Sequence, residues 1–253
     1  MVILARELSN KCEKLVASVL RTLPITVYFR DIREIGRSTY GCTDFSHYNE
    51  GYCNIYLNLE QSPIQFEVTL LHELHHVEQV GKGYPYVMNK IKGNTFQENP
   101  TFYEKIGSQI QSAILDLDVI TYLEIQGLSS SIFSDFGQED DLSFVWKNVT
   151  DQTLEDPSNL TEAVLHLYVG YVRAGENGKI AILNSVQQFP RIIKAFEAMQ
   201  EAIEIEKCCD PLYCAYAMGW IIDHFSLWKN YYIDFRGERI RTHGEYLKYF
   251  DKT

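Results

Sequence analysis

Two histidines spaced four residues apart, His72 and His76, and a glutamate directly after the first, Glu73, form the segment of this chain whose chemistry is easiest to interpret. On an α-helix, positions i and i+4 share a face, so the two imidazoles can bind one metal ion together. A glutamate beside the first ligand can take a proton from a water molecule that the metal polarises. The spacing therefore predicts a metal site at His72 and His76, with Glu73 as its catalytic residue.

The residues before this segment predict the elements that position it. Residues 52–59 alternate between apolar and polar side chains, which is typical of a half-buried strand. Ser62 then fits the N-cap of a helix, Pro63 its first position and Gln65 the third position of a capping box. Because Gly81 can end such a helix, we expect it to run from Pro63 to about Val80, directly after a strand.

Apolar spacing predicts helices through most of the remaining chain, with a few other elements in the first half. We expect a helix at 3–23, a strand at 25–32, a loop or weak hairpin at 36–51, a connection at 84–100 and a helix at 100–127. A serine- and acid-rich loop at 129–141 is the best boundary candidate. Beyond it we expect helices at 142–149, 159–174, 179–207, 211–230 and 240–250. The expected fold is therefore α+β and mostly helical, with a metal-binding domain at 1–128 and an all-helical half at 129–253 that packs on it or continues it.

Two histidines do not complete a catalytic zinc site, which needs a third protein ligand and an open position for water. Asp116, Asp118 and Glu124 lie in the otherwise apolar helix expected at 100–127. Burying a carboxylate is costly unless it is paired or bound to a metal. Asp116 is the first choice because the small neighbour Ala113 lets another helix approach, Asp118 is the alternative, and Glu124 is third. Each acid can instead accept a hydrogen bond from a histidine or tyrosine, or orient a ligand imidazole.

The order helix, strands, His-Glu-x-x-His helix resembles the zinc metallopeptidases of the zincin type over residues 1–128. The specific part of this resemblance lies in residues 62–80. The chain is most similar to the gluzincins but lacks their Asn-Glu-x-x-x-Asp sequence, so its third ligand is atypical. It also lacks the His-x-x-Gly-x-x-His sequence of the metzincins, since no histidine follows within a few residues of Gly81 and Gly83.

The resemblance implies a hydrolase that binds one Zn²⁺ ion and cleaves a peptide or protein substrate, with Glu73 as the base. The strand at 52–59 would border the cleft and pair with an extended substrate. A second hypothesis is a metal-binding regulatory or structural module of the same fold without turnover. A third is that His72 and His76 belong to a polar core network without a metal.

Four other histidines have sequence surroundings that are less typical of metal ligands than those of His72 and His76. His75 points about 100° further round the helix than His76, which favours a role in packing or in orienting a ligand. His47, His166 and His224 are expected to be hydrogen-bonded core or surface residues. His166 and His224 are also candidates for stabilising an oxyanion.

Composition and charge narrow the class of partner. The formal net charge is −11, and residues 38–170 hold nineteen acidic and five basic groups, a balance of −14. Such acidity argues against nucleic acid as a partner.

No apolar run approaches the roughly 18 residues of a membrane span, and the first apolar run is too short for a signal peptide. The six cysteines are irregularly spaced, which predicts reduced thiols in a cytoplasmic protein. The oligomeric state is not predicted.

Overall fold

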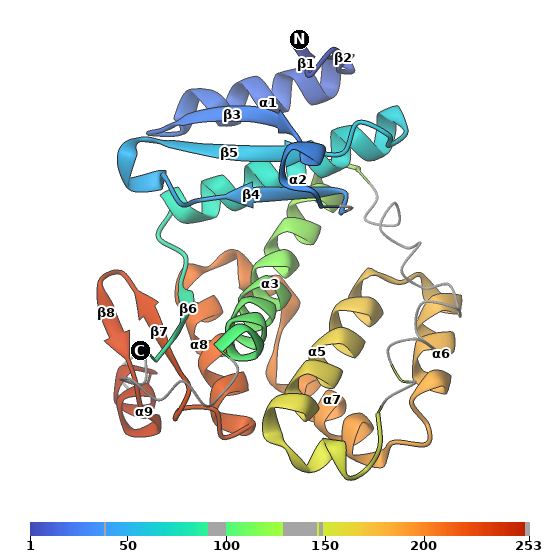
Figure 1. Cartoon of the computed structure of the whole chain (residues 1–253), viewed down its shortest axis with the longest axis vertical. Coiled ribbons are helices and arrows are strands. Elements are labelled where there is room, and N and C mark those ends of the chain that lie inside the picture. Colours follow the sequence, from blue (N-terminus) through green and yellow to red (C-terminus); the bar gives the residue numbers. More distant parts are fainter. Residues whose placement is uncertain (38, 91–99, 129–145, 147–148, 251–253) are drawn as a thin grey trace. The chain divides into compact units, whose positions relative to one another are not determined.

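The computed structural model describes residues 1–253 apart from 38, 91–99, 129–145, 147–148 and 251–253 (Figure 1). The described chain is mostly helical with small sheets, as expected of the predicted α+β class. Its helices are α1 (Asn10–Thr22), α2 (Pro63–Gly81), α3 (Pro100–Ile125), α5 (Pro157–Arg173), α6 (Glu176–Ser185), α7 (Pro190–Ala202), α8 (Pro211–His224) and α9 (His243–Phe250). Its strands are β1 (Val2–Ile3), β2 (Arg6–Glu7), β3 (Thr26–Asp31), β4 (Gly41–Asp44), β5 (Tyr52–Leu57), β6 (Tyr86–Asn89), β7 (Tyr231–Phe235) and β8 (Glu238–Ile240).

The chain divides into two compact units, each described separately below. The first comprises Met1–Gly83 and Tyr122–Ile132, and the second comprises Tyr84–Thr121 and Phe133–Thr253. Helix α3 begins in the second unit and ends in the first. The predicted domains 1–128 and 129–253 stay a prediction, because compactness alone does not define an independently folding domain.

The first unit contains a three-stranded sheet in the order β3-β5-β4. Strand β5 pairs with β3 in parallel, from Thr26 opposite Tyr52 to Asp31 opposite Leu57, and with β4 antiparallel, from Gly41 opposite Leu57 to Asp44 opposite Asn54. Since both sides of β5 are occupied, the prediction that strand 52–59 pairs with a substrate is wrong. Strand β4, which lies at 41–44 within the predicted loop or weak hairpin, is one of the two edge strands of this sheet, and β3 is the other.

Helix α2 packs against α1, β4 and β5 in the first unit. Its start is the predicted one: the Ser62 side chain accepts from the Gln65 backbone N–H, and the Gln65 side chain accepts from the Ser62 N–H. Most of its circumference is buried, with Phe66, Leu70 and Leu74 fully enclosed. Burial on several sides fixes the rotation of the helix, and with it the directions of His72 and His76.

The second unit contains the N-terminal part of α3, the helices α5–α9 and a three-stranded sheet in the order β6-β7-β8. Its core is a single apolar cluster to which α5, α7 and α8 contribute Leu167, Phe196 and Met218. The prediction of an all-helical C-terminal half is therefore wrong. Tyr231, Ile233 and Phe235 are buried and alternate with half-buried residues, as in a strand, and Arg236 and Gly237 form the turn with positive φ.

Several predicted helix boundaries also differ from the observed ones. The single helix expected at 179–207 is two helices, because Pro190 cannot donate the backbone hydrogen bond that would continue α6 and instead begins α7. The loop predicted at 129–141 lies outside the described residues, as does nearly all of the helix predicted at 142–149. Among the residues described, no helix has both the length and the apolar character needed to cross a membrane.

Candidate metal centre

His72 and His76 converge on one point from consecutive turns of α2. Their Nε2 atoms lie 3.1 Å apart and their ring planes are inclined at 84°. Two nitrogens that bind one tetrahedral zinc ion, each at 2.0–2.1 Å, are separated by roughly 3.3 Å. The two imidazoles are therefore already arranged as a pair of metal ligands, and both are half-buried rather than enclosed.

Gln79 orients the second of these rings. Its side chain is fully buried, and its Oε1 atom lies 2.9 Å from Nδ1 of His76. An amide oxygen only accepts hydrogen bonds, so Nδ1 of His76 carries the proton and its Nε2 presents a lone pair. A hydrogen bond of this kind to the outer nitrogen is the usual support of a metal-binding histidine.

Glu73 lies beside His72 with its side chain buried against β4. Thr43 Oγ1 donates a hydrogen bond of 2.8 Å to Glu73 Oε2 and lies 3.3 Å from the backbone oxygen of Glu73. Glu73 is 8% exposed. Its carboxylate is therefore held on the β4 side of α2, one residue after the first of the two histidines.

The three acids proposed as third ligand have different surroundings. Asp116 and Asp118 are buried, at 7% and 6% exposure. Asp118 Oδ2 lies 3.0 Å from the hydroxyl of Tyr84, and burial and the Asp118 charge raise the pKa of that tyrosine. Glu124, the third choice, is exposed rather than buried in the apolar helix face. The helix ends at Ile125, and its last turn carries Glu124 and Ile125 on a solvent-facing side.

His72, His76 and Asp116 form a group that could hold a metal ion. His72 and His76 belong to the first unit and Asp116 to the second. Asp118 and Glu124 do not belong to this group, and among the described cysteines Cys208, Cys209 and Cys214 form no such group either. Two imidazole nitrogens and one carboxylate oxygen make a donor set that suits zinc and leaves a fourth position open.

Arg173, the last residue of α5, forms an ion pair with Asp116. Its Nη2 atom donates to Asp116 Oδ2, and both side chains are largely buried. A carboxylate has two oxygens, so this pairing fixes the orientation of the group and is compatible with ligation through Oδ1.

The other histidines have partners of their own. His75 is buried, stacks on Tyr122 with ring centroids 4.4 Å apart, and lies 3.1 Å from Glu78 Oε2, in agreement with its predicted packing role. His47 stacks on Tyr52. His166 Nε2 lies 2.9 Å from Gln109, and His224 stacks on Trp220, with burial lowering its pKa. These contacts account for the four rings as hydrogen-bonded or stacked residues.

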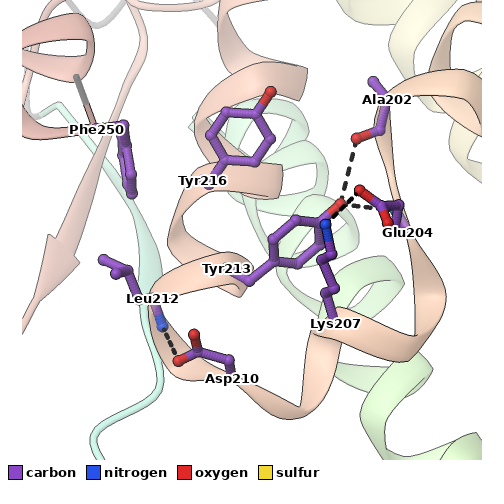
Figure 2. A pocket seen from close by; sticks show the side chains of 8 residues that line it. All are labelled: Ala202, Glu204, Lys207, Asp210, Leu212, Tyr213, Tyr216 and Phe250. Atoms are coloured by element: carbon purple, nitrogen blue, oxygen red, sulfur yellow. Dashed lines mark hydrogen bonds and ion pairs between the residues drawn. The ribbon is translucent and has the colours of Figure 1, made fainter. Parts of the chain in front are cut away.

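A separate pocket of about 370 Å³ lies at the surface of the second unit (Figure 2). Tyr213, Tyr216 and Phe250 form its aromatic walls. Its charged groups already have partners within the chain. Lys207 pairs with Glu204 at 2.7 Å, and Asp210 caps α8 by accepting from the Leu212 N–H. The Tyr213 hydroxyl accepts from the Glu204 N–H. These contacts hold the turn between α7 and α8, which explains the polar groups without a ligand.

Sequence patterns did not identify Thr43, Gln79 or Arg173 as members of this neighbourhood. Gln79 had a usable signal, because it follows His76 by three residues and therefore shares its helix face. Thr43 lies in a four-residue strand, and Arg173 is 57 residues from Asp116, so neither has a local signal that points to the site.

Comparison with known proteins gives no relative from which to transfer a role. No family model, no curated protein and no solved structure matches this chain. The function is therefore argued from the geometry of the site alone.

Proposed function

We propose that this protein is a zinc-dependent metallopeptidase of the zincin type, in which His72, His76 and Asp116 bind one Zn²⁺ ion and Glu73 is the general base. The observation that carries the proposal is the 3.1 Å separation of the His72 and His76 Nε2 atoms on one helix. Glu73, the residue after His72, is held by a hydrogen bond from Thr43. The Gln79 hydrogen bond that leaves the His76 Nε2 lone pair available supports it further.

Bound zinc supplies a Lewis acid, which makes a nearby water acidic close to neutral pH and polarises a carbonyl. Glu73 accepts a proton from the attacking water as the water oxygen bonds to the carbonyl carbon of the substrate. Glu73 then gives this proton to the amine nitrogen as the C–N bond breaks. The products are a carboxylic acid and an amine, and Glu73 returns to its starting state.

We further propose that the substrate binds in an extended conformation along β4. This strand pairs only with β5 in the described part of the chain, so its other side presents backbone donors and acceptors. It also packs on α2, the helix that carries the two histidines. An added substrate strand would gain affinity from backbone hydrogen bonds and specificity from alternate side chains.

Metal analysis combined with peptide digestion tests the proposed function. The purified protein should contain close to one zinc per chain and should cleave members of a mixed peptide library, as followed by mass spectrometry. Glu73→Gln should retain zinc and lose at least about 100-fold in rate, because only the proton acceptor is removed. A protein that binds no zinc at stoichiometric occupancy would contradict the proposal.

The alternative is a metal-binding regulatory or structural module without turnover. The pairing of Arg173 with Asp116 favours it, because a guanidinium neutralises part of the charge that a ligand carboxylate offers to the metal. The same experiment separates the two functions. Zinc at full occupancy with no cleavage of any library peptide would identify the module.

A further inference from the structure

We infer that Thr43 is a positioning residue for Glu73, and that Gly41 provides the space in which the Glu73 side chain is held. This inference rests on the proposed function for its catalytic meaning. The contacts themselves lie within the first unit and do not depend on a bound metal.

The direct observation is the hydrogen bond from a strand to the proposed base. Thr43 Oγ1 lies 2.8 Å from Glu73 Oε2, the usual length of a hydrogen bond from a hydroxyl to an oxygen. A hydrogen bond to one carboxylate oxygen also fixes the direction of the other, since the group is planar. Thr43 therefore sets the orientation of the group that must meet the attacking water.

Gly41 explains how the carboxylate can lie so close to β4. A Cβ atom at this position would be 2.6 Å from Thr69 Cγ2 and 3.0 Å from Glu73 Oε1. A side chain at this position would therefore force the Thr69 and Glu73 side chains to shift from their observed places. Alternation along the strand places Gly41 and Thr43 on the same face, so one residue leaves room for Glu73 and the other holds it.

Positioning matters because proton transfer requires the donor and acceptor in hydrogen-bond reach. A displacement of about 1 Å costs a catalytic step up to 100-fold in rate. Thr43 contacts the base and is not proposed to contact the substrate through its side chain. Removing its hydroxyl should therefore lower kcat and leave KM nearly unchanged.

A double-mutant cycle in the zinc-free protein tests the contact without reference to activity. The variants are Thr43→Val, Glu73→Ala and the double variant, and the measurement is the urea midpoint of unfolding. We expect Thr43→Val to lower the midpoint in the wild-type background and to have less than half of that effect in the Glu73→Ala background. Additive effects would overturn the inference.

Steady-state kinetics on a cleaved library peptide test the catalytic part. We expect Thr43→Val to lower kcat about 10- to 100-fold at unchanged zinc content, with KM within about threefold. Thr43→Ser restores a hydroxyl and should stay within about threefold of wild type. Thr26→Val, at an exposed threonine of β3 in the same sheet, is the matched control and should leave kcat unchanged.

The outcomes distinguish failure of this inference from failure of the proposed function. A wild-type enzyme that cleaves peptides, with Thr43→Val equally fast, would overturn the role of Thr43 alone. A zinc-loaded wild type that cleaves nothing, with a non-additive cycle, would overturn the proposed hydrolysis and the catalytic role with it, while the contact between Thr43 and Glu73 would stand.

Discussion

The Nδ1 atom of His76 lies 2.9 Å from the Oε1 atom of Gln79, whose side chain is wholly buried. Burial makes this amide a rigid support, because a shift of Gln79 would require its neighbours in the core to move. The hydrogen bond selects the tautomer of His76 that has a lone pair on Nε2, the atom that faces His72.

Gln79→Ala should weaken zinc binding about 10- to 100-fold, because the His76 ring loses the partner that orients it. Competition against a chromophoric chelator measures this change. Glu78→Gln is the control: Glu78 contacts His75, which is not a proposed ligand, so zinc affinity should stay within about threefold. Equal zinc affinities for Gln79→Ala and wild type would contradict this account of Gln79.

Asp116→Asn and Asp118→Asn should separate the two buried acids of α3. Asp116 belongs to the group that could hold a metal, whereas Asp118 lies against the Tyr84 hydroxyl. We expect Asp116→Asn to lower zinc affinity at least about 10-fold, since a neutral amide is a weak zinc ligand. Asp118→Asn should bind zinc like wild type and lose about 1–3 kcal/mol of stability. Isothermal titration and urea unfolding measure the two effects. A reversed result would make Asp118 the third ligand.

Gly219→Ala should destabilise the second unit by about 1–3 kcal/mol, because overpacking a core forces its neighbours to shift. A Cβ atom at Gly219 would lie 2.4 Å from a ring carbon of Tyr246. Gly244→Ala is the matched control, since no described atom lies within 4 Å of a Cβ at that position of α9 and alanine favours helix. Thermal unfolding followed by circular dichroism measures both variants, and an equal midpoint for the two would contradict the close packing of α8 against α9.

The stability of the protein should fall as the pH rises from about 9 to about 11. Burial raises the pKa of the Cys53 thiol from 9.0 to about 11, so the folded state keeps a proton that the unfolded chain has lost. A group with a raised folded pKa stabilises the fold below its unfolded pKa, and this contribution disappears as the pH passes through the folded value. Urea unfolding at pH 8, 9.5 and 10.5 measures the trend, and Cys53→Ala should make it shallower. An identical slope in this variant would show that other groups cause it.

Elements with a strong local pattern could be predicted from the sequence. The capping box at Ser62 and Gln65 and the alternation at residues 52–59 are short-range signals, and they placed α2 and β5 to within about two residues. The spacing of His72 and His76 also fixed their common face, because helix geometry is local.

Other features depend on contacts that a local pattern does not contain. Strand β4 has four residues, too few for a clear alternation, so its pairing with β5 and its contact with Glu73 were not predicted. Strand β7 alternates clearly at Tyr231, Ile233 and Phe235, but a helix was expected because the apolar content around it is high. The apolar spacing in the sequence continues to the end of helix α3, but the buried face of the helix ends before Glu124.

The pairing of β6 with β7 brings residues 86–89 together with residues 231–234. Closing so long a loop costs entropy that is recovered only when both strands are present. During synthesis, this sheet therefore forms only after residues 231–234 have left the ribosome, whereas residues 1–83 of the first unit leave it before them. A chain that stops before residue 231 leaves β6 without its partner, so the synthesis of residues 231–235 decides when the second unit can reach its native state.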